Sequence, residues 1–263
     1  MSNIEPTSKV VVNILKQIIF LPITLVQVVF GKKPFSELFA PLRTAWRFLL
    51  QAKGTLTLIV IILLTTLAGW YLGFVETWIQ FPQDLFTERW WSFFTATLIH
   101  ADIAHIVGNL MLLFVMGRIV ERELGTRQLI LLYLAAIVVS GIGTSIIYQY
   151  VIPSTTGGLG ASGAIMGITA VALLLKPFQL TFEFIIPLPL AVVGAFLIYA
   201  DITNLFVNDG VGHLTHLAGF FLTGMLAYVT NRSKQKDMHK GVVVTLLLSV
   251  AMYLLGIYEA VMV

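Results

Sequence analysis

Hydrophobic runs of up to about twenty residues alternate with short polar segments along most of this chain. A helix needs about twenty apolar residues to span the hydrocarbon core of a bilayer, so these runs predict membrane-spanning helices. The pattern predicts an all-α fold, a polytopic bundle of membrane helices. We expect seven spans, within residues 56–74, 102–120, 128–148, 162–175, 184–202, 212–230 and 241–257.

The first 53 residues differ from the rest because polar and basic side chains interrupt their apolar stretches. Residues 10–30 are apolar overall but contain Lys16, Gln17 and Pro22. Ionisable side chains are costly inside a bilayer, so we favour an interfacial amphipathic or re-entrant segment here over a transmembrane helix. The predicted domains are a cytoplasmic or interfacial segment (1–53), a six-helix core (54–231), and a basic loop with a seventh transmembrane helix (232–263).

Composition supports a membrane protein and excludes several other classes. Hydrophobic residues make up 58% of the chain and charged residues 11%, whereas a soluble domain carries about 25% charged residues. The net charge of +3 comes from basic residues in short loops and does not indicate nucleic-acid binding. The chain has no cysteine, which excludes disulfides, thiol catalysis and thiolate metal ligands.

The basic residues also predict how the chain crosses the membrane. They lie in the N-terminal segment, in residues 121–127, at Lys176 and in residues 232–240. The intervening segments 75–101, 149–159 and 203–211 hold one arginine and no lysine. Because cytoplasmic loops are enriched in lysine and arginine, the N-terminus should be cytoplasmic and the C-terminus outside. We expect a multi-pass protein of a prokaryotic plasma membrane.

Candidate chemistry begins at Gly160-Ala161-Ser162-Gly163, where an uncharged loop precedes an apolar helix. A helix N-terminus presents unpaired N–H groups and partial positive charge, which suit a developing oxyanion. Gly163 and Gly167 keep one face of this helix small. In membrane helices such small residues often serve only for close packing, so this stretch alone leaves packing and catalysis both open.

Polar side chains on three predicted spans reach a similar depth. At about 1.5 Å per residue, Asn109 is roughly 20 Å from Arg122, Ser162 roughly 21 Å from Lys176, and His216 roughly 24 Å from Arg232. Buried polar groups within membranes are costly and commonly functional. The agreement predicts one site that contains a hydroxyl, an imidazole and a carboxamide.

Serine and histidine together form the minimal unit of nucleophilic catalysis, in which the imidazole accepts the hydroxyl proton and returns it to the leaving amine. His105 and Asn109 share a helix face and could assist the oxyanion, while Gly219 would let the helix of His216 approach Ser162. No carboxylate is expected at this depth, and Asp201 is interpreted as an interfacial cap. We therefore predict a dyad.

Four sequence motifs resemble those of the rhomboid family, in the same order. They are Trp91-Ser92-Phe93-Phe94-Thr95 followed by His100, His105 and Asn109; Gly117-Arg118-Ile119-Val120-Glu121 followed by Leu124-Gly125; Gly160-Ala161-Ser162-Gly163; and His216-Leu217-Ala218-Gly219. The resemblance implies a six-helix core with an added seventh helix and the activity of an intramembrane serine protease. It implies that Ser162 is the nucleophile and His216 the general base, with His105, Asn109, Gly160 and Gly163 supporting the oxyanion.

The same resemblance implies that a transmembrane segment of a substrate protein enters laterally from the lipid bilayer, past the fifth helix and the loop 75–101. It implies no cofactor. Three positions depart from the family pattern. Ser92 replaces an arginine that would pair with the acid at Glu121, Met166 replaces an aromatic residue, and Thr223 replaces a glycine. These departures affect gating and packing but leave the dyad in place.

Other interpretations of the same residues remain. The histidines or Asn109 could be structural, and His100, His105, His213 and His216 could bind zinc, although we expect no metal because no H-E-x-x-H motif is present. A small-solute transporter would show repeated halves, which we do not find. The main alternative is a catalytically inactive relative that binds client membrane proteins.

Overall fold

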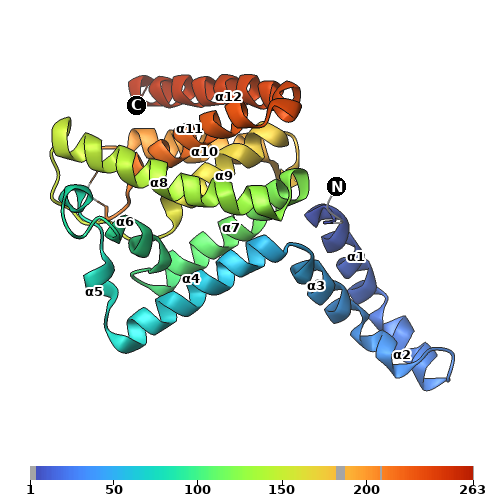
Figure 1. Cartoon of the computed structure of the whole chain (residues 1–263). Coiled ribbons are helices and arrows are strands. Elements are labelled where there is room, and N and C mark those ends of the chain that lie inside the picture. Colours follow the sequence, from blue (N-terminus) through green and yellow to red (C-terminus); the bar gives the residue numbers. More distant parts are fainter. Residues whose placement is uncertain (1–3, 182–186, 208, 263) are drawn as a thin grey trace.

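The computed structural model describes residues 4–181, 187–207 and 209–262, which are mostly helical (Figure 1). Residues 184–186 of the expected fifth span, and the ends of the first and third predicted domains at 1–3 and 263, lie outside this description. The α-helices are α1 (Thr7–Ile19), α2 (Leu21–Val29), α3 (Ala40–Gln51), α4 (Lys53–Leu72), α5 (Val75–Trp78), α6 (Ser92–Thr95), α7 (Ile103–Leu124), α8 (Thr126–Tyr150), α9 (Ser162–Leu175), α10 (Leu190–Thr203), α11 (His213–Thr230) and α12 (Gln235–Met262).

Short elements complete the fold. Two strands, β1 (Leu180–Thr181) and β2 (Leu188–Pro189), pair antiparallel just before α10. Single 3-10 turns are η1 (Phe35–Phe39), η2 (Pro82–Phe86), η3 (Ala96–Leu98) and η4 (Arg232–Lys234). Two of these turns, η2 and η3, lie with α5 and α6 in the segment between α4 and α7, which therefore has an ordered backbone despite lacking a long helix.

The all-α polytopic membrane fold is confirmed. Among the described residues, four helices are long and apolar enough to cross a membrane: Lys53–Leu72, Ile103–Leu124, Thr126–Tyr150 and Arg232–Gly256. Helices α9 and α10 are apolar but have 14 residues each, or about 21 Å, less than the ~30 Å hydrocarbon core. The count of six core helices plus a seventh remains a prediction.

The N-terminal segment forms a separate group of helices at one corner of the molecule (blue in Figure 1). The apolar stretch expected at residues 10–30 is split between α1 and α2, which meet at an angle of 51°. The break follows Ile19 and precedes Pro22, which lies in the first turn of α2, where its missing N–H is tolerated. Helix α1 packs against α3.

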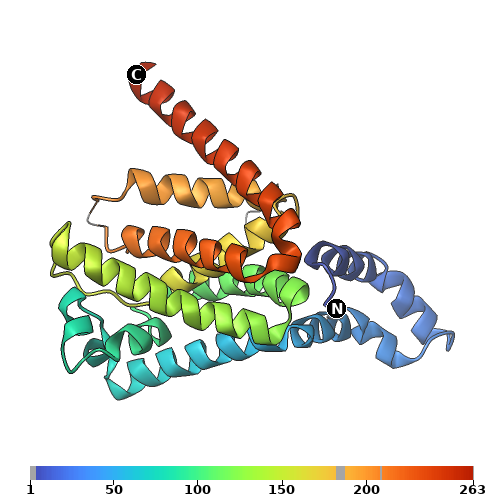
Figure 2. The same cartoon turned by 45° about the horizontal axis from the view of Figure 1, so that its top comes forward.

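Helix α9 is the centre of the bundle, and α7, α8, α11 and α12 all contact it. All of its residues except Ser162 and Leu174 are buried. A helix that is apolar on every side suits such a central position. Figure 2 shows α12 leaning away from the other helices toward its C-terminal end.

Helices α9 and α11 approach each other so closely that Gly219 and Gly167 have no room for a side chain. A methyl group on Gly219 would lie 2.0 Å from the Gly163 carbonyl oxygen, and one on Gly167 would lie 2.6 Å from Thr223 Oγ1. Small residues permit this separation, as expected for tightly packed membrane helices. Thr223, one of the departures from the family pattern, therefore faces a glycine across the interface.

The acid at Glu121 binds the start of α4. Its carboxylate accepts hydrogen bonds from the backbone N–H groups of Gly54 and Thr55 at 2.8 and 2.9 Å and from Thr55 Oγ1 at 2.8 Å. A carboxylate is favourable there because it satisfies unpaired N–H groups and the helix dipole. Ser92 donates instead to Asp84 Oδ2 at 3.1 Å. The arginine–acid pair of the family pattern is therefore replaced by two separate contacts, one between Ser92 and Asp84 and one between Glu121 and the start of α4.

We expect Gly219→Ala to lower the free energy of unfolding by about 1–3 kcal/mol or more, because the added methyl group meets rigid backbone. Denaturation in mixed detergent micelles would measure the change. Gly108→Ala is the matched control, since a methyl group on this α7 glycine has nothing within 4 Å; it should be neutral or stabilising by up to about 1 kcal/mol. Equal effects of the two substitutions would contradict the packing argument.

Candidate active site

The predicted site residues gather where α7, α9 and α11 begin. Ser162 is the first residue of α9, His216 lies in the first turn of α11, and His105 and Asn109 lie in the first two turns of α7. The Gly163–Gly219 contact brings the beginnings of α9 and α11 together. Ser162, His105 and His216 are each half-buried, and Asn109 is buried.

Gly160 shapes the loop that leads to the serine. Its φ of 109° lies in a region that L-amino acids rarely adopt. A methyl group there would also lie 2.7 Å from His105 Nε2 and 3.7 Å from Asn109 Nδ2. The absent side chain therefore lets both polar groups of α7 approach the backbone two residues before Ser162.

Backbone hydrogen bonds fix this loop against the segment between α4 and α7. The Gly160 N–H donates to the Ala96 carbonyl at 2.8 Å, and Gly158 exchanges two hydrogen bonds with Gln80. The Ala161 N–H donates to His100 Nε2 at 3.4 Å. The expected loop 75–101 thus supports the serine directly.

His100 has a structural place in this arrangement. It is fully buried, and its Nδ1 lies 3.1 Å from Thr66 Oγ1, while Nε2 accepts from the Ala161 N–H. Both ring nitrogens are therefore occupied by contacts that link α4 to the serine loop. The sequence alone left open whether His100 was structural or a metal ligand, and these contacts favour the structural interpretation.

Asn109 carries a buried donor with no acceptor among the described residues. Its Nδ2 is buried without a hydrogen-bond partner, although such groups are nearly always paired in native proteins. This donor faces the position that a Gly160 side chain would occupy. The donor is therefore available to an acceptor that binds beside Gly160.

A cavity of about 520 Å³ adjoins the serine. Its lining includes Ser162, His105 and Gly160, together with residues of α8 and of the loops before α9 and α11. The wall combines apolar groups with hydroxyls and backbone amides. A peptide segment and water could therefore reach the serine from this cavity.

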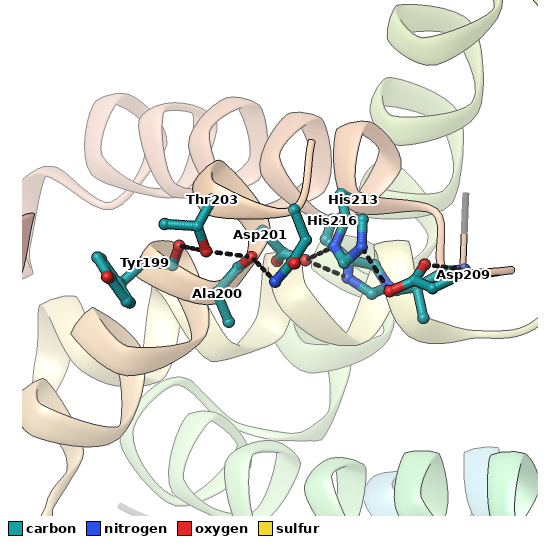
Figure 3. Close-up of polar contacts among 9 residues, drawn as sticks. Tyr199, Ala200, Asp201, Thr203, Asp209, His213 and His216 are labelled. Atoms are coloured by element: carbon teal, nitrogen blue, oxygen red, sulfur yellow. Dashed lines mark hydrogen bonds and ion pairs between the residues drawn. The ribbon is translucent and has the colours of Figure 1, made fainter. Parts of the chain in front are cut away.

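Asp201 overturns the prediction that no carboxylate orients the imidazole. Asp201 Oδ1 lies 2.9 Å from His216 Nδ1, and its side chain is only 7% exposed (Figure 3). The interpretation of Asp201 as an interfacial cap was wrong, because the last turn of α10 lies beside the first turn of α11. Sequence reasoning missed this residue, although an ionisable group within an apolar run was a usable signal.

His213 shares the same carboxylate. Its Nδ1 lies 2.8 Å from Asp201 Oδ1, and its Nε2 lies 3.2 Å from Asp209 Oδ2. The ligand atoms of Asp201, His213 and His216 fall within 4.8 Å of one another, so these groups could also hold a metal ion. This set differs from the four histidines considered from the sequence, because His100 and His105 form a separate pair with ring centroids 4.8 Å apart.

No hydrogen bond joins the Ser162 hydroxyl to His216 in the part of the chain that the structure describes. Catalytic hydrogen bonds are often long without substrate and shorten in the reacting complex. The arrangement offers a serine at a helix N-terminus, unpaired donors beside it and an imidazole on the adjoining helix. These parts are suited to acyl transfer.

Comparison with known proteins agrees with the geometry. Residues 87–234 match the sequence model of the Rhomboid domain, more than half of the chain. The chloroplastic Rhomboid-like protein 11 of Arabidopsis thaliana is 28% identical over 166 residues, which cover 58% of this chain and 57% of that protein. The mitochondrial RHOMBOID-like protein 12 of the same plant is 34% identical over 140 residues, 48% and 42% of the two chains.

A bacterial protease is also similar. Rhomboid protease GlpG of Photorhabdus laumondii is 34% identical over 107 residues, which cover 38% of this chain and 37% of that protein. The chain spans about half the length of the two plant relatives. The family match at residues 87–234 includes the predicted site residues.

We expect Gly160→Ala to lower the free energy of unfolding by about 2–4 kcal/mol, because it combines backbone strain with a clash against His105. Gly73→Ala is the matched control: Gly73 has φ 75°, but nothing lies within 4 Å of the added methyl group, so only about 1 kcal/mol of strain remains. Both variants can be compared by unfolding in detergent. If Gly160→Ala costs no more than Gly73→Ala, the combined cost assigned to backbone strain and to the contact with His105 is incorrect.

Proposed function

The chain belongs to the rhomboid family, and from this we propose that it is an intramembrane serine protease. It hydrolyses a peptide bond in or beside the transmembrane segment of a membrane protein. Ser162 is the nucleophile and His216 the general base. The observation that carries the proposal is the unpartnered Asn109 amide beside the loop of a serine that begins an otherwise buried helix.

The reaction divides into acylation and deacylation. His216 accepts the Ser162 proton as the oxygen attacks the substrate carbonyl, then donates it to the leaving amine. Water from the cavity, activated by the same imidazole, then releases the acyl group. These steps need neither a metal nor an organic cofactor.

Charge on the carbonyl oxygen is stabilised by donors that have no acceptor among the described residues. The Ser162 N–H lies in the first turn of α9, where backbone donors have no intrahelical partner. Asn109 Nδ2 supplies a side-chain donor and His105 a second one. Gly160 admits these two groups because it carries no side chain. Gly163 supports the site differently, since its missing side chain leaves room for Thr215 and Ser140.

The substrate is a transmembrane segment that enters from the lipid bilayer, past α10 and the segment 75–101. In this proposal the chain crosses a prokaryotic plasma membrane seven times, with its N-terminus cytoplasmic and its C-terminus outside. Residues 1–53 lie at the cytoplasmic interface. Helices α9 and α10 are then short spans of 14 residues each.

One alternative is an inactive family member that binds client membrane proteins. The lack of a hydrogen bond between Ser162 and His216 among the described residues is the observation that favours it. A binding protein would need the cavity and the bilayer access but not an activated hydroxyl. Reactivity of the serine separates the two functions.

We expect a fluorophosphonate to label the purified protein at Ser162. Labelling should be lost in Ser162→Ala and fall at least about 100-fold in His216→Ala, because the hydroxyl then lacks a base. In-gel fluorescence measures the rate, and Ser233→Ala, in the exposed η4 turn, is the control. Folded wild-type protein that stays unlabelled would favour the client-binding alternative.

Asn109→Ala should slow labelling about 100-fold without unfolding the protein, because one oxyanion donor is lost. Substitution removes a group that has no partner in the free protein, so stability should change little. Asn13→Ala, at an exposed position of α1, serves as the control. An unchanged labelling rate would exclude Asn109 from the oxyanion site.

A further inference from the structure

Asp201 is a buried carboxylate in the last turn of α10, with 5% of its surface exposed. Burying a charged group is costly unless hydrogen bonds and opposite charge compensate it. Figure 3 shows that Asp201 faces two imidazoles of α11. The two imidazole rings supply this compensation.

The hydrogen bonds of Asp201 determine which ring nitrogen of His216 carries a proton. Asp201 Oδ1 lies 2.9 Å from His216 Nδ1 and 2.8 Å from His213 Nδ1. An ionised carboxylate can only accept, so both Nδ1 atoms must carry protons. Neutral His216 then has its lone pair on Nε2, the nitrogen that faces away from Asp201. A free Nε2 is what a general base for Ser162 requires.

His213 joins this carboxylate to a second one. Its Nε2 lies 3.2 Å from Asp209 Oδ2, so both ring nitrogens face carboxylate oxygens, and the doubly protonated ring satisfies both. The Val211 N–H donates to Asp209 Oδ1 at 2.9 Å and holds the pKa of that loop carboxyl below its ordinary value. His213 thereby ties the end of α10 to the loop before α11.

We propose that Asp201 is a positioning residue that holds His216 in the Nδ1–H tautomer, with His213 and Asp209 keeping Asp201 in place. This inference rests on the proposed protease function and extends the predicted dyad to a third group. Asp201 need not touch the substrate. It acts through His216, by fixing the ring and by stabilising the imidazolium formed when Ser162 loses its proton.

Two other roles would use the same residues. Asp201 could serve only to tie α10 to α11, or the group of Asp201, His213 and His216 could bind a divalent metal ion. The first role predicts a loss of stability without any change in the pH profile of the remaining activity. The second predicts dependence on metal. Both differ measurably from positioning.

The pH profile is informative because the charged groups around His216 are few. Asp201 faces it from α10, His213 lies one turn earlier on its own helix, and Asp209 reaches His213 from the loop. His105 of α7 is close enough to interact with it electrostatically. Removing the Asp201 charge should therefore disfavour the imidazolium and move the midpoint of the profile to lower pH.

The first experiment measures fluorophosphonate labelling rates of wild type, Asp201→Asn and Asp201→Glu between pH 5 and 9, normalised to the monodisperse folded fraction. Asp201→Asn should label up to about 100-fold more slowly than wild type, and the midpoint of its pH profile should lie at lower pH. Asp201→Glu should recover part of the rate. Asp237→Asn, an exposed aspartate of α12, is the charge-matched control. A normal rate and midpoint in Asp201→Asn would overturn the proposal.

A second measurement needs no change at Asp201. Nitrogen-15 spectra of histidine-labelled wild type, assigned by comparison with His216→Ala, report the tautomer of His216. The Nδ1–H form is expected, and the Nε2–H form would overturn the proposal even if Asp201→Asn does not fold. Wild-type labelling should also survive a chelator; loss that zinc restores would show a metal site instead.

Different results would refute the protease function and the positioning role of Asp201. Wild-type protein that never labels refutes the protease function, whatever the tautomer of His216. Wild-type protein that labels normally, beside an equally reactive folded Asp201→Asn, refutes only the positioning role.

Discussion

The contact between α9 and α11 is the constraint on which the rest of the site depends. Where a Gly219 side chain would lie, the Gly163 carbonyl oxygen is only 2.0 Å away, so the two backbones meet without intervening atoms. That separation places the first turn of α9, with Ser162, beside the first turn of α11, with His216. Larger residues at this point would force the first turns of the two helices apart.

Buried polar groups complete the arrangement, each in a different way. Glu121 is satisfied by the backbone at the start of α4 and so serves the fold. Asp201 is satisfied by two imidazoles. Asn109 keeps an amide donor unsatisfied, which is unfavourable for a folded protein and useful only if an acceptor arrives.

The sequence predicted the helical membrane fold because hydrophobic runs report span length directly. It placed Ser162, His216 and Asn109 at a similar depth, because counting residues from the basic loops gives depth. Helix periodicity placed His105 on the same face as Asn109. It missed Asp201, since the contact with His216 depends on how the loop between α10 and α11 reverses, and no local pattern encodes that. It also left residues 10–30 ambiguous, where the chain forms two helices at 51°.

The most direct test of this account is a structure of the protein after reaction with a fluorophosphonate. We expect phosphorus bonded to Ser162 Oγ, its free oxygen within hydrogen-bond distance of Asn109 Nδ2 and the Ser162 N–H, and His216 Nε2 facing the adduct. An adduct whose oxygen points away from Asn109, or a Ser162 that remains unmodified while another residue reacts, would contradict the proposed site.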